Sequence, residues 1–158
     1  MIKTKYLVFQ TLNESFGIKN DLIVDVLDGF NEKIIEKISS NRYTHLYYKS
    51  KPLQIICYYK NGQMFPGSNG QCSILVIKNQ YSAENFLGLP IDYISGCSTF
   101  DDPTFPLIKL FSNRQLCNYS LCINDKLIHI LDAGKIAESA GFDKKRNFAK
   151  AGINIYCS

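Results

Sequence analysis

The sequence predicts a mainly β protein whose two similar halves form a pair of small barrels. Two observations lead to this fold class. Runs of β-branched and aromatic residues alternate with short segments rich in Gly, Pro, Asn and Asp along most of the chain. The chain also repeats itself: residues 6–27 and 74–96 pass through a similar order of elements, and residues 50–57 match residues 125–132.

The offset between equivalent residues of the two halves changes little along the chain. Tyr6 corresponds to Ile74, an offset of 68 residues, and Ser50 corresponds to Asp125, an offset of 75 residues. This growing offset requires only a few inserted residues. A half of roughly seventy residues buries little apolar surface alone, so we expect the two halves to share an interface core.

The first half is predicted to open with a hairpin, in which strands over residues 6–10 and 16–18 flank a turn at residues 13–15. A second turn then leads to a strand over residues 22–27, in which Asp25 is expected to face water. The alternation of side chains makes this stretch extended rather than helical.

In the rest of the first half the spacing of the apolar residues changes. Residues 31–40 carry Ile, Glu and Lys at helical spacing and predict a short amphipathic helix. Residues 43–48 and 53–59 predict the two strands of a hairpin, separated by a break at residues 49–52. Residues 61–71 contain three Gly, one Pro and two Asn, and predict a loop that connects the halves.

The second half is expected to begin with strands over residues 74–78 and 86–89. A loop with two prolines is predicted over residues 98–106, and three strands follow at residues 108–111, 115–123 and 126–132.

Asp132 stands directly before the apolar segment AGKIAESAGF and is expected to cap a short helix over residues 133–140, which Gly141 ends. The tail over residues 143–158 has no clear pattern.

Composition and charge favour a globular, soluble protein. The chain is 46% hydrophobic and 13% aromatic, and its 18 basic and 14 acidic residues give a net charge of +4, which is more typical of a solubility feature than of a nucleic-acid footprint. The apolar run near the start ends at Gln10 after four residues, too few for the core of a signal peptide, and no run elsewhere reaches membrane-spanning length. We therefore expect a cytoplasmic protein that does not insert into a membrane.

The six cysteines include no Cys-x-x-Cys pair and stand mostly within apolar segments. They are expected to be small buried hydrophobic side chains rather than disulfides or zinc ligands. Their positions are Cys57, Cys72, Cys97, Cys117, Cys122 and Cys157.

No motif of a catalytic centre is present: the sequence lacks HExxH, GxSxG, the Rossmann glycines and the Walker pattern. His45 and His129, the two histidines, are expected to be packed strand residues. Asp101–Asp102 is typical of a turn, and Cys117 and Cys122 would lie on opposite faces of a strand. We therefore expect no enzyme activity, no cofactor and no metal.

Four apolar motifs follow one another along the chain: YLVF…FGI…IVDVL, YYKSKPLQIICYYK, SILVIKNQY…LGLPIDYISG and NYSLCINDKLIHILDAGKI. In this order they resemble the CheW-like family of bacterial chemosensory adaptors over roughly residues 5–140. The resemblance implies two intertwined five-stranded SH3-like barrels with short helices around a joint hydrophobic core. It also implies a non-catalytic scaffold that couples the cytoplasmic tips of chemoreceptors to the regulatory domain of a CheA-type histidine kinase.

On this resemblance one CheW-like domain covers residues 1–142. Its first barrel is expected at about residues 5–66, its second barrel at about residues 72–134 and its short helix at about residues 133–140. Residues 143–158 form a C-terminal tail.

The resemblance also implies where partners bind. Residues 23–26 fall on the family's Val-x-Glu-Val pattern, and residues 47–50 fall on its Asn-Leu-Arg-Gly turn, which in such adaptors lies near the receptor and kinase contacts. Lys49 keeps only the charge of the family's arginine, because Lys lacks the planar fork that grips a carboxylate. The expected protein-binding residues are Asp25, Val26, Lys49, Ser50 and Lys51.

The departures from the family pattern favour a divergent adaptor, with a pathway that controls type IV pili and twitching motility as a sub-hypothesis. An alternative from another class is a β-barrel that binds a small molecule or single-stranded nucleic acid. The ten Tyr, the ten Phe and the net positive charge motivate this alternative.

Overall fold

A computed structural model describes most of the chain, and its three longer gaps are residues 32–45, 102–115 and 143–155. The described residues are 3–11, 13–31, 46–60, 63–65, 71–101, 116–123, 125–142 and 156–157.

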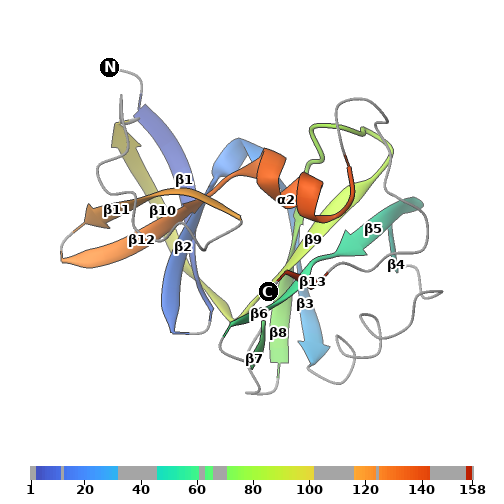
Figure 1. Ribbon diagram of the computed structural model, residues 1–158, viewed down its shortest axis with the longest axis horizontal. Coiled ribbons are helices and arrows are strands. Elements are labelled where there is room, and N and C mark those ends of the chain that lie inside the picture. Colours follow the sequence, from blue (N-terminus) through green and yellow to red (C-terminus); the bar gives the residue numbers. More distant parts are fainter. Residues whose placement is uncertain are drawn as a thin grey trace.

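Within these residues, ten strands form two five-stranded sheets (Figure 1). The first half supplies β1 (Lys3–Thr11), β2 (Glu14–Lys19), β3 (Ile23–Asn31), β4 (Leu46–Tyr48) and β5 (Lys51–Ile55). The second half supplies β8 (Gln71–Ile77), β9 (Phe86–Ile91), β10 (Tyr93–Asp101), β11 (Cys117–Ile123) and β12 (Lys126–Leu131). A smaller sheet, a 3₁₀ turn and one helix complete the fold: β6 (Cys57–Lys60), β7 (Gln63–Phe65), β13 (Tyr156–Cys157), η1 (Asn20–Leu22) and α2 (Ala133–Ser139).

The two large sheets have the same architecture. Sheet A has the order β10-β1-β2-β12-β11, and sheet B has the order β3-β8-β9-β5-β4. The equivalent strands of the two halves are β1 and β8, β2 and β9, β3 and β10, β4 and β11, and β5 and β12. Replacing each strand by its equivalent converts one order into the other. Each sheet therefore contains strands of both halves. The predicted intertwining is confirmed. The predicted division into one barrel over residues 5–66 and another over residues 72–134 is wrong, because each sheet takes strands from both ranges.

Equivalent glycines stand where two strands run parallel within each sheet. β2 pairs with β12 at Gly17, and β9 pairs with β5 at Gly88. A Cβ on Gly17 would lie 2.9 Å from Cδ1 of Ile130, and one on Gly88 would lie 2.6 Å from Cδ1 of Ile55. A side chain at either position would require the isoleucine to shift, and the same contact between a glycine and an isoleucine occurs once in each sheet.

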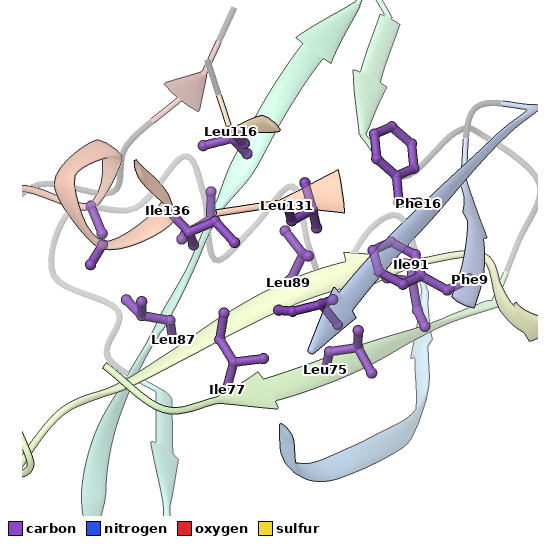
Figure 2. Packing of buried hydrophobic residues seen from close by; sticks show 14 of the residues in the cluster. Phe9, Phe16, Leu75, Ile77, Leu87, Leu89, Ile91, Leu116, Leu131 and Ile136 are labelled. Atoms are coloured by element: carbon purple, nitrogen blue, oxygen red, sulfur yellow. The ribbon is translucent and has the colours of Figure 1, made fainter. Parts of the chain in front are cut away.

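Buried side chains form a joint core between the sheets and a smaller cluster within each barrel. The joint core takes side chains from β1, β2, β8, β9 and α2, so neither half could complete it alone (Figure 2). The members labelled in that view are Phe9, Phe16, Leu75, Ile77, Leu87, Leu89, Ile91, Leu116, Leu131 and Ile136.

The helix α2 lies between the two sheets (Figure 1) and begins as predicted. Oδ1 of Asp132 accepts a hydrogen bond of 3.0 Å from the backbone N–H of Lys135, which is the expected N-cap. Gly141, with a φ of 88°, follows the last turn. The hydroxyl of Tyr81, in the connection after β8, donates to Oε1 of Glu138 at 3.1 Å, so α2 joins sheet A to a loop of sheet B.

Two predicted loops contain strand. Residues 98–101, predicted to begin a loop, continue β10 because they pair with β1. Residues 61–71 were predicted to be a connection, but β7 lies within this range and β8 begins at its last residue.

The predicted strand over residues 53–59 is also wrong in one respect, because the chain divides it at Ile56 into β5 and β6, which belong to different sheets. The backbone N–H of Ile56 donates to the carbonyl of Gly88 at 2.8 Å, and the side chain is fully buried.

The C-terminal tail, for which the sequence predicts no element, contributes β13, a two-residue strand that pairs in parallel with β6. Of the predicted helix over residues 31–40, only Asn31 is described, and it ends β3 instead of beginning a helix. The predicted strand over residues 108–111, His45 and Asp102 lie outside the described residues.

The prediction that the cysteines are buried is wrong for Cys97 and Cys122, which are exposed on β10 and β11, while Cys117 is half-buried. These two strands are the edges of sheet A, where an outward side chain meets no covering layer.

A candidate protein-interaction site at the β4–β5 hairpin

The β4–β5 hairpin is the edge of sheet B and ends in a two-residue turn, Lys49–Ser50. Both residues have positive φ, 48° for Lys49 and 65° for Ser50. Hairpins of this length favour such turns because their twist matches that of the strands, but Asn and Gly are the residues that adopt them without strain. The chain therefore presents a lysine and a serine at the tip at some conformational cost.

A side-chain hydrogen bond joins Asp25 and Tyr48 between the two edge strands of sheet B. The hydroxyl of Tyr48 on β4 donates to Oδ2 of Asp25 on β3 at 2.6 Å, and the backbone N–H of Val26 donates to Oδ1 at 2.7 Å. β3 and β4 are the two opposite edges of sheet B. This hydrogen bond therefore joins the ends of the sheet and positions the hairpin against β3.

The same contact sets the protonation of both groups. The hydroxyl of Tyr48, then the N–H of Val26 and the charge of Lys49, lower the pKa of Asp25 below its ordinary value. The bond to Asp25 raises the pKa of Tyr48 in turn. Around neutral pH the pair is thus an ionised carboxylate that accepts from a neutral phenol.

Two lysines lie over an aromatic pair below the turn. The rings of Tyr48 and Phe86 pack edge to face with centroids 5.4 Å apart. Nζ of Lys49 lies 5.4 Å from the centre of the Tyr48 ring, and Nζ of Lys51 lies 5.7 Å from that of Phe86. Lys51 also donates to the carbonyl of Ala83 at 3.3 Å. These contacts hold both ammonium groups close to the hairpin.

An apolar surface adjoins these charges. Tyr47 has 61% of its surface exposed, and its partner across the hairpin, Pro52, is exposed as well. Among the residues that the structure describes, neither Lys49 nor Lys51 forms an ion pair with a carboxylate. The hairpin therefore offers a ring and two cations to a partner, on a backbone fixed by the Asp25–Tyr48 bond.

The structure brings four of the five predicted site residues together: Asp25, Lys49, Ser50 and Lys51. Asp25 is half-buried and hydrogen-bonded rather than simply facing water. Val26 is next to it on β3, but its side chain packs against the joint core.

The predicted protein-binding residues did not include Pro52 and Phe86, nor Tyr47, although residues 47–50 fall on the turn that the resemblance places near the contacts. Tyr47 and Tyr48 are neighbours on a strand, so one had to point outward and the other inward. That alternation could have identified Tyr47 as the exposed ring.

A second polar cluster lies on sheet A, where its serine and histidine are buried and its glutamate is partly exposed. Oγ of Ser120 lies 2.6 Å from Nδ1 of His129, and Nε2 of His129 lies 3.9 Å from Oε1 of Glu14. Ser120 is 1% exposed and His129 is 3% exposed, and the imidazole packs against the ring of Phe16. A serine this deeply buried cannot reach a substrate, so the cluster is a packing arrangement, and the prediction that His129 is a packed strand residue is confirmed.

Within the described ranges, no three His, Cys, Asp or Glu side chains lie close enough together to hold a metal ion. A search of the same residues for a helix long and apolar enough to cross a membrane finds none.

Comparison with known proteins gives a match in structure but not in sequence. No family model matches the chain, and no curated protein matches its sequence. The solved structure of the scaffolding protein TtCheW from Thermoanaerobacter tengcongensis is similar, with a TM-score of 0.58 and 14% sequence identity. The match covers 83% of this chain and 90% of that chain. The predicted fold class, two intertwined five-stranded SH3-like barrels with short helices, is confirmed as CheW-like.

Proposed function

We propose that this chain is a non-catalytic adaptor of a chemosensory pathway. In this role it couples the cytoplasmic tip of a chemoreceptor to the regulatory domain of a CheA-type histidine kinase, and it works in the cytoplasm. The exposed, cationic β4–β5 hairpin on a CheW-like fold is the observation that carries the proposal. The similar structure is that of a protein described as a scaffold, which supports a role in assembly.

The hairpin supplies the two kinds of contact that a specific interface needs. Tyr47 and Pro52 offer apolar surface for the centre of the contact, and Lys49 and Lys51 offer charge for acidic side chains at its rim. A standard interface buries about 800 Å² on each partner, so the hairpin forms part of a larger surface on sheet B.

Within this class of adaptor, we propose a divergent member that acts in a pathway controlling type IV pili and twitching motility. The lysine at the position of the family's arginine supports the divergence, because a partner that contacts Lys49 cannot rely on a bidentate grip.

Calorimetry of the full chain with the kinase regulatory domain from the same genome tests the adaptor role. We expect Kd in the micromolar range, and an absence of binding at about 100 μM would contradict the proposal. Tyr47→Ala should weaken binding roughly tenfold or more, because it removes an exposed ring at the centre of the surface, and Lys49→Glu should weaken binding because it reverses a charge at the rim.

The duplication supplies a matched control for these variants. Lys126 follows the equivalent turn in sheet A and is exposed. Lys126→Glu changes the net charge of the protein as Lys49→Glu does. It should leave the affinity unchanged; an equal loss in both variants would show that only overall charge matters.

A second candidate function is binding of single-stranded nucleic acid or of a small aromatic ligand. The exposed ring of Tyr47 beside two lysines favours it, because single-strand binders combine stacking rings with cations. Binding of a fluorescent oligonucleotide should then be strong at low salt and weaken steeply as salt rises. If no oligonucleotide binds at low salt, the nucleic-acid version is excluded.

A further inference from the structure

Among the described strands, β10 is an edge of sheet A. It pairs with β1 at eight positions on one side, with a register shift at Ser95, and no described strand pairs with its other side. From Cys97 to Asp101 the pairing with β1 is continuous, so the backbone is regularly extended there. A strand edge of this kind presents a row of backbone donors and acceptors to another chain.

In sheet B a side-chain hydrogen bond joins the equivalent edge strand, β3, to the opposite edge strand, β4, and the corresponding positions of sheet A cannot form it. Gly96 of sheet A corresponds to Asp25 of sheet B, because Gly96 pairs with Val8 and Asp25 pairs with the equivalent Val76. Ile123 corresponds to Tyr48, because each is the last residue before the turn of its hairpin. Glycine and isoleucine cannot form the hydrogen bond that joins Asp25 to Tyr48. No described atom lies within 4 Å of a Cβ built on Gly96.

The edge has few of the features that usually protect an edge strand against pairing. Natural edge strands carry Lys, Pro, inward charges or β-bulges, whereas β10 (YISGCSTFD) has one register shift, at Ser95, no proline and a single charged residue, Asp101, at its end. Ile, Thr, Tyr and Phe favour extended structure. The outward residues at its middle are small: Ser95, Cys97 and Thr99 are all exposed.

Two larger side chains add apolar surface at the start of the strand. Tyr93 is 60% exposed and Ile94 is 38% exposed. With Tyr47, they are the exposed large hydrophobic residues of the described chain. Phe100 near the other end points inward and stacks on the ring of Tyr6 at 5.4 Å, so it holds the strand flat against the barrel.

We propose that β10 is a dimer-forming edge, on which the β10 of a second copy of this chain adds antiparallel across a two-fold axis at Cys97. This register places Asp101 opposite Tyr93 and Ser95 opposite Thr99 of the other copy, so no like charges face each other. A parallel pairing would bring the two Asp101 residues together. An edge without charge is its own complement, whereas an edge built for a different protein would carry charges to select it.

The dimer is expected to be weak and reversible. A pair of edge strands with two flanking side chains buries less than a standard interface of about 1,600 Å² in total, which corresponds to transient association. This association is separate from the β4–β5 hairpin, because β10 belongs to sheet A and the hairpin to sheet B.

Sedimentation velocity on the full chain under reducing conditions tests the dimer. The sedimenting mass should rise toward twice that of the monomer as the concentration increases to about 500 μM. Cys97→Lys should abolish this rise, because it places two lysines directly opposite each other. The matched control, Cys122→Lys on the other edge strand, changes an equally exposed thiol and should leave the dimer intact.

Oxidative cross-linking gives an independent readout of the register. Directly opposite residues of antiparallel strands have Cα atoms about 4.5 to 5.5 Å apart, within the range for a disulfide. An added copper–phenanthroline oxidant would take two electrons and two protons from two Cys97 thiols and leave one S–S bond. The dimer band on a non-reducing gel should persist in Cys122→Ser and disappear in Cys97→Ser.

In sedimentation, three results would overturn the proposal: a monomer at every concentration, a dimer that persists in Cys97→Lys, or a dimer that is lost in Cys122→Lys as well. In cross-linking, a dimer band that persists in Cys97→Ser would overturn it. Circular dichroism of each lysine variant establishes that it is folded. If Cys97→Lys does not fold, the cross-linking result with Cys97→Ser decides.

Discussion

At the scale of single residues, the fold depends on a few contacts that join distant segments. Asp25 and Tyr48 are 23 positions apart in the chain, and their hydrogen bond closes the barrel of sheet B. Gly17 and Gly88 let two pairs of strands run side by side under an isoleucine. Each contact leads to a direct test.

Tyr48→Phe should destabilise the protein and weaken its response to acid. The fold lowers the pKa of Asp25, so this carboxylate stabilises the native state above its ordinary value of 3.8, and the contribution is lost as the pH falls through the lower folded value. The fold raises the pKa of Tyr48, so the phenol's contribution is present below 10.0 and lost as the pH rises beyond it.

Urea unfolding of both proteins across this pH window measures the effect. The difference between wild type and Tyr48→Phe should be largest between about pH 4 and pH 10 and should shrink at either end. A difference that does not change with pH would mean that the bond does not couple to either ionisation.

Gly88→Ala should lower the free energy of unfolding by about 1 to 3 kcal/mol, because the new methyl group would meet Cδ1 of Ile55 in a packed core. Ile55→Val removes that atom. The double variant should therefore be more stable than the sum of the two single changes predicts, which a double-mutant cycle by urea unfolding would measure. Strict additivity would contradict the contact.

At the scale of elements, the β4–β5 turn combines function with strain. Ser50 has a φ of 65°, a conformation that glycine adopts at no steric cost. Ser50→Gly should raise the free energy of unfolding by about 1 kcal/mol, because it relieves the strained backbone at this position. Thermal unfolding checks this expectation. A destabilised variant would show that the turn is not strained.

The sequence predicted the elements whose patterns are local. The β1–β2 hairpin, the β4–β5 hairpin and the cap at Asp132 each depend on residues next to one another, and the structure contains all three. Residues 98–101 were misassigned because nearby prolines suggested a loop, whereas pairing with a strand some ninety residues earlier decides where β10 ends. The division at Ile56 has no local signal either, because it arises when the chain leaves one sheet for another.

The candidate site was predicted in part for the same reason. Lys49, Ser50 and Lys51 form one turn that the motif order indicated. Their relation to Asp25 and Phe86 depends on closure of the barrel, which brings three separate strands together.

At the scale of the whole molecule, the duplication is the dominant feature. It could be detected as a sequence offset, but the exchange of strands between halves could not, because a repeat does not indicate which sheet each strand joins. The observed sheets each need strands from both halves, and the joint core needs both as well.

The halves should therefore not fold separately. Residues 1–66 and 71–142, each produced alone, should lack a cooperative unfolding transition, because each would leave its part of the joint core exposed. Mixed in equal amounts, they should regain β structure by circular dichroism and unfold cooperatively. A half that folds cooperatively by itself would contradict this account of the core.

The adaptor role is tested most directly by titrating the isotopically labelled chain with the kinase regulatory domain and following its backbone amide signals by NMR. The account predicts shifts centred on Tyr47 to Lys51 and on Asp25, with the amides of β11 and β12 unchanged. Signals that do not move at saturating partner, or that move on sheet A and not at the hairpin, would contradict it.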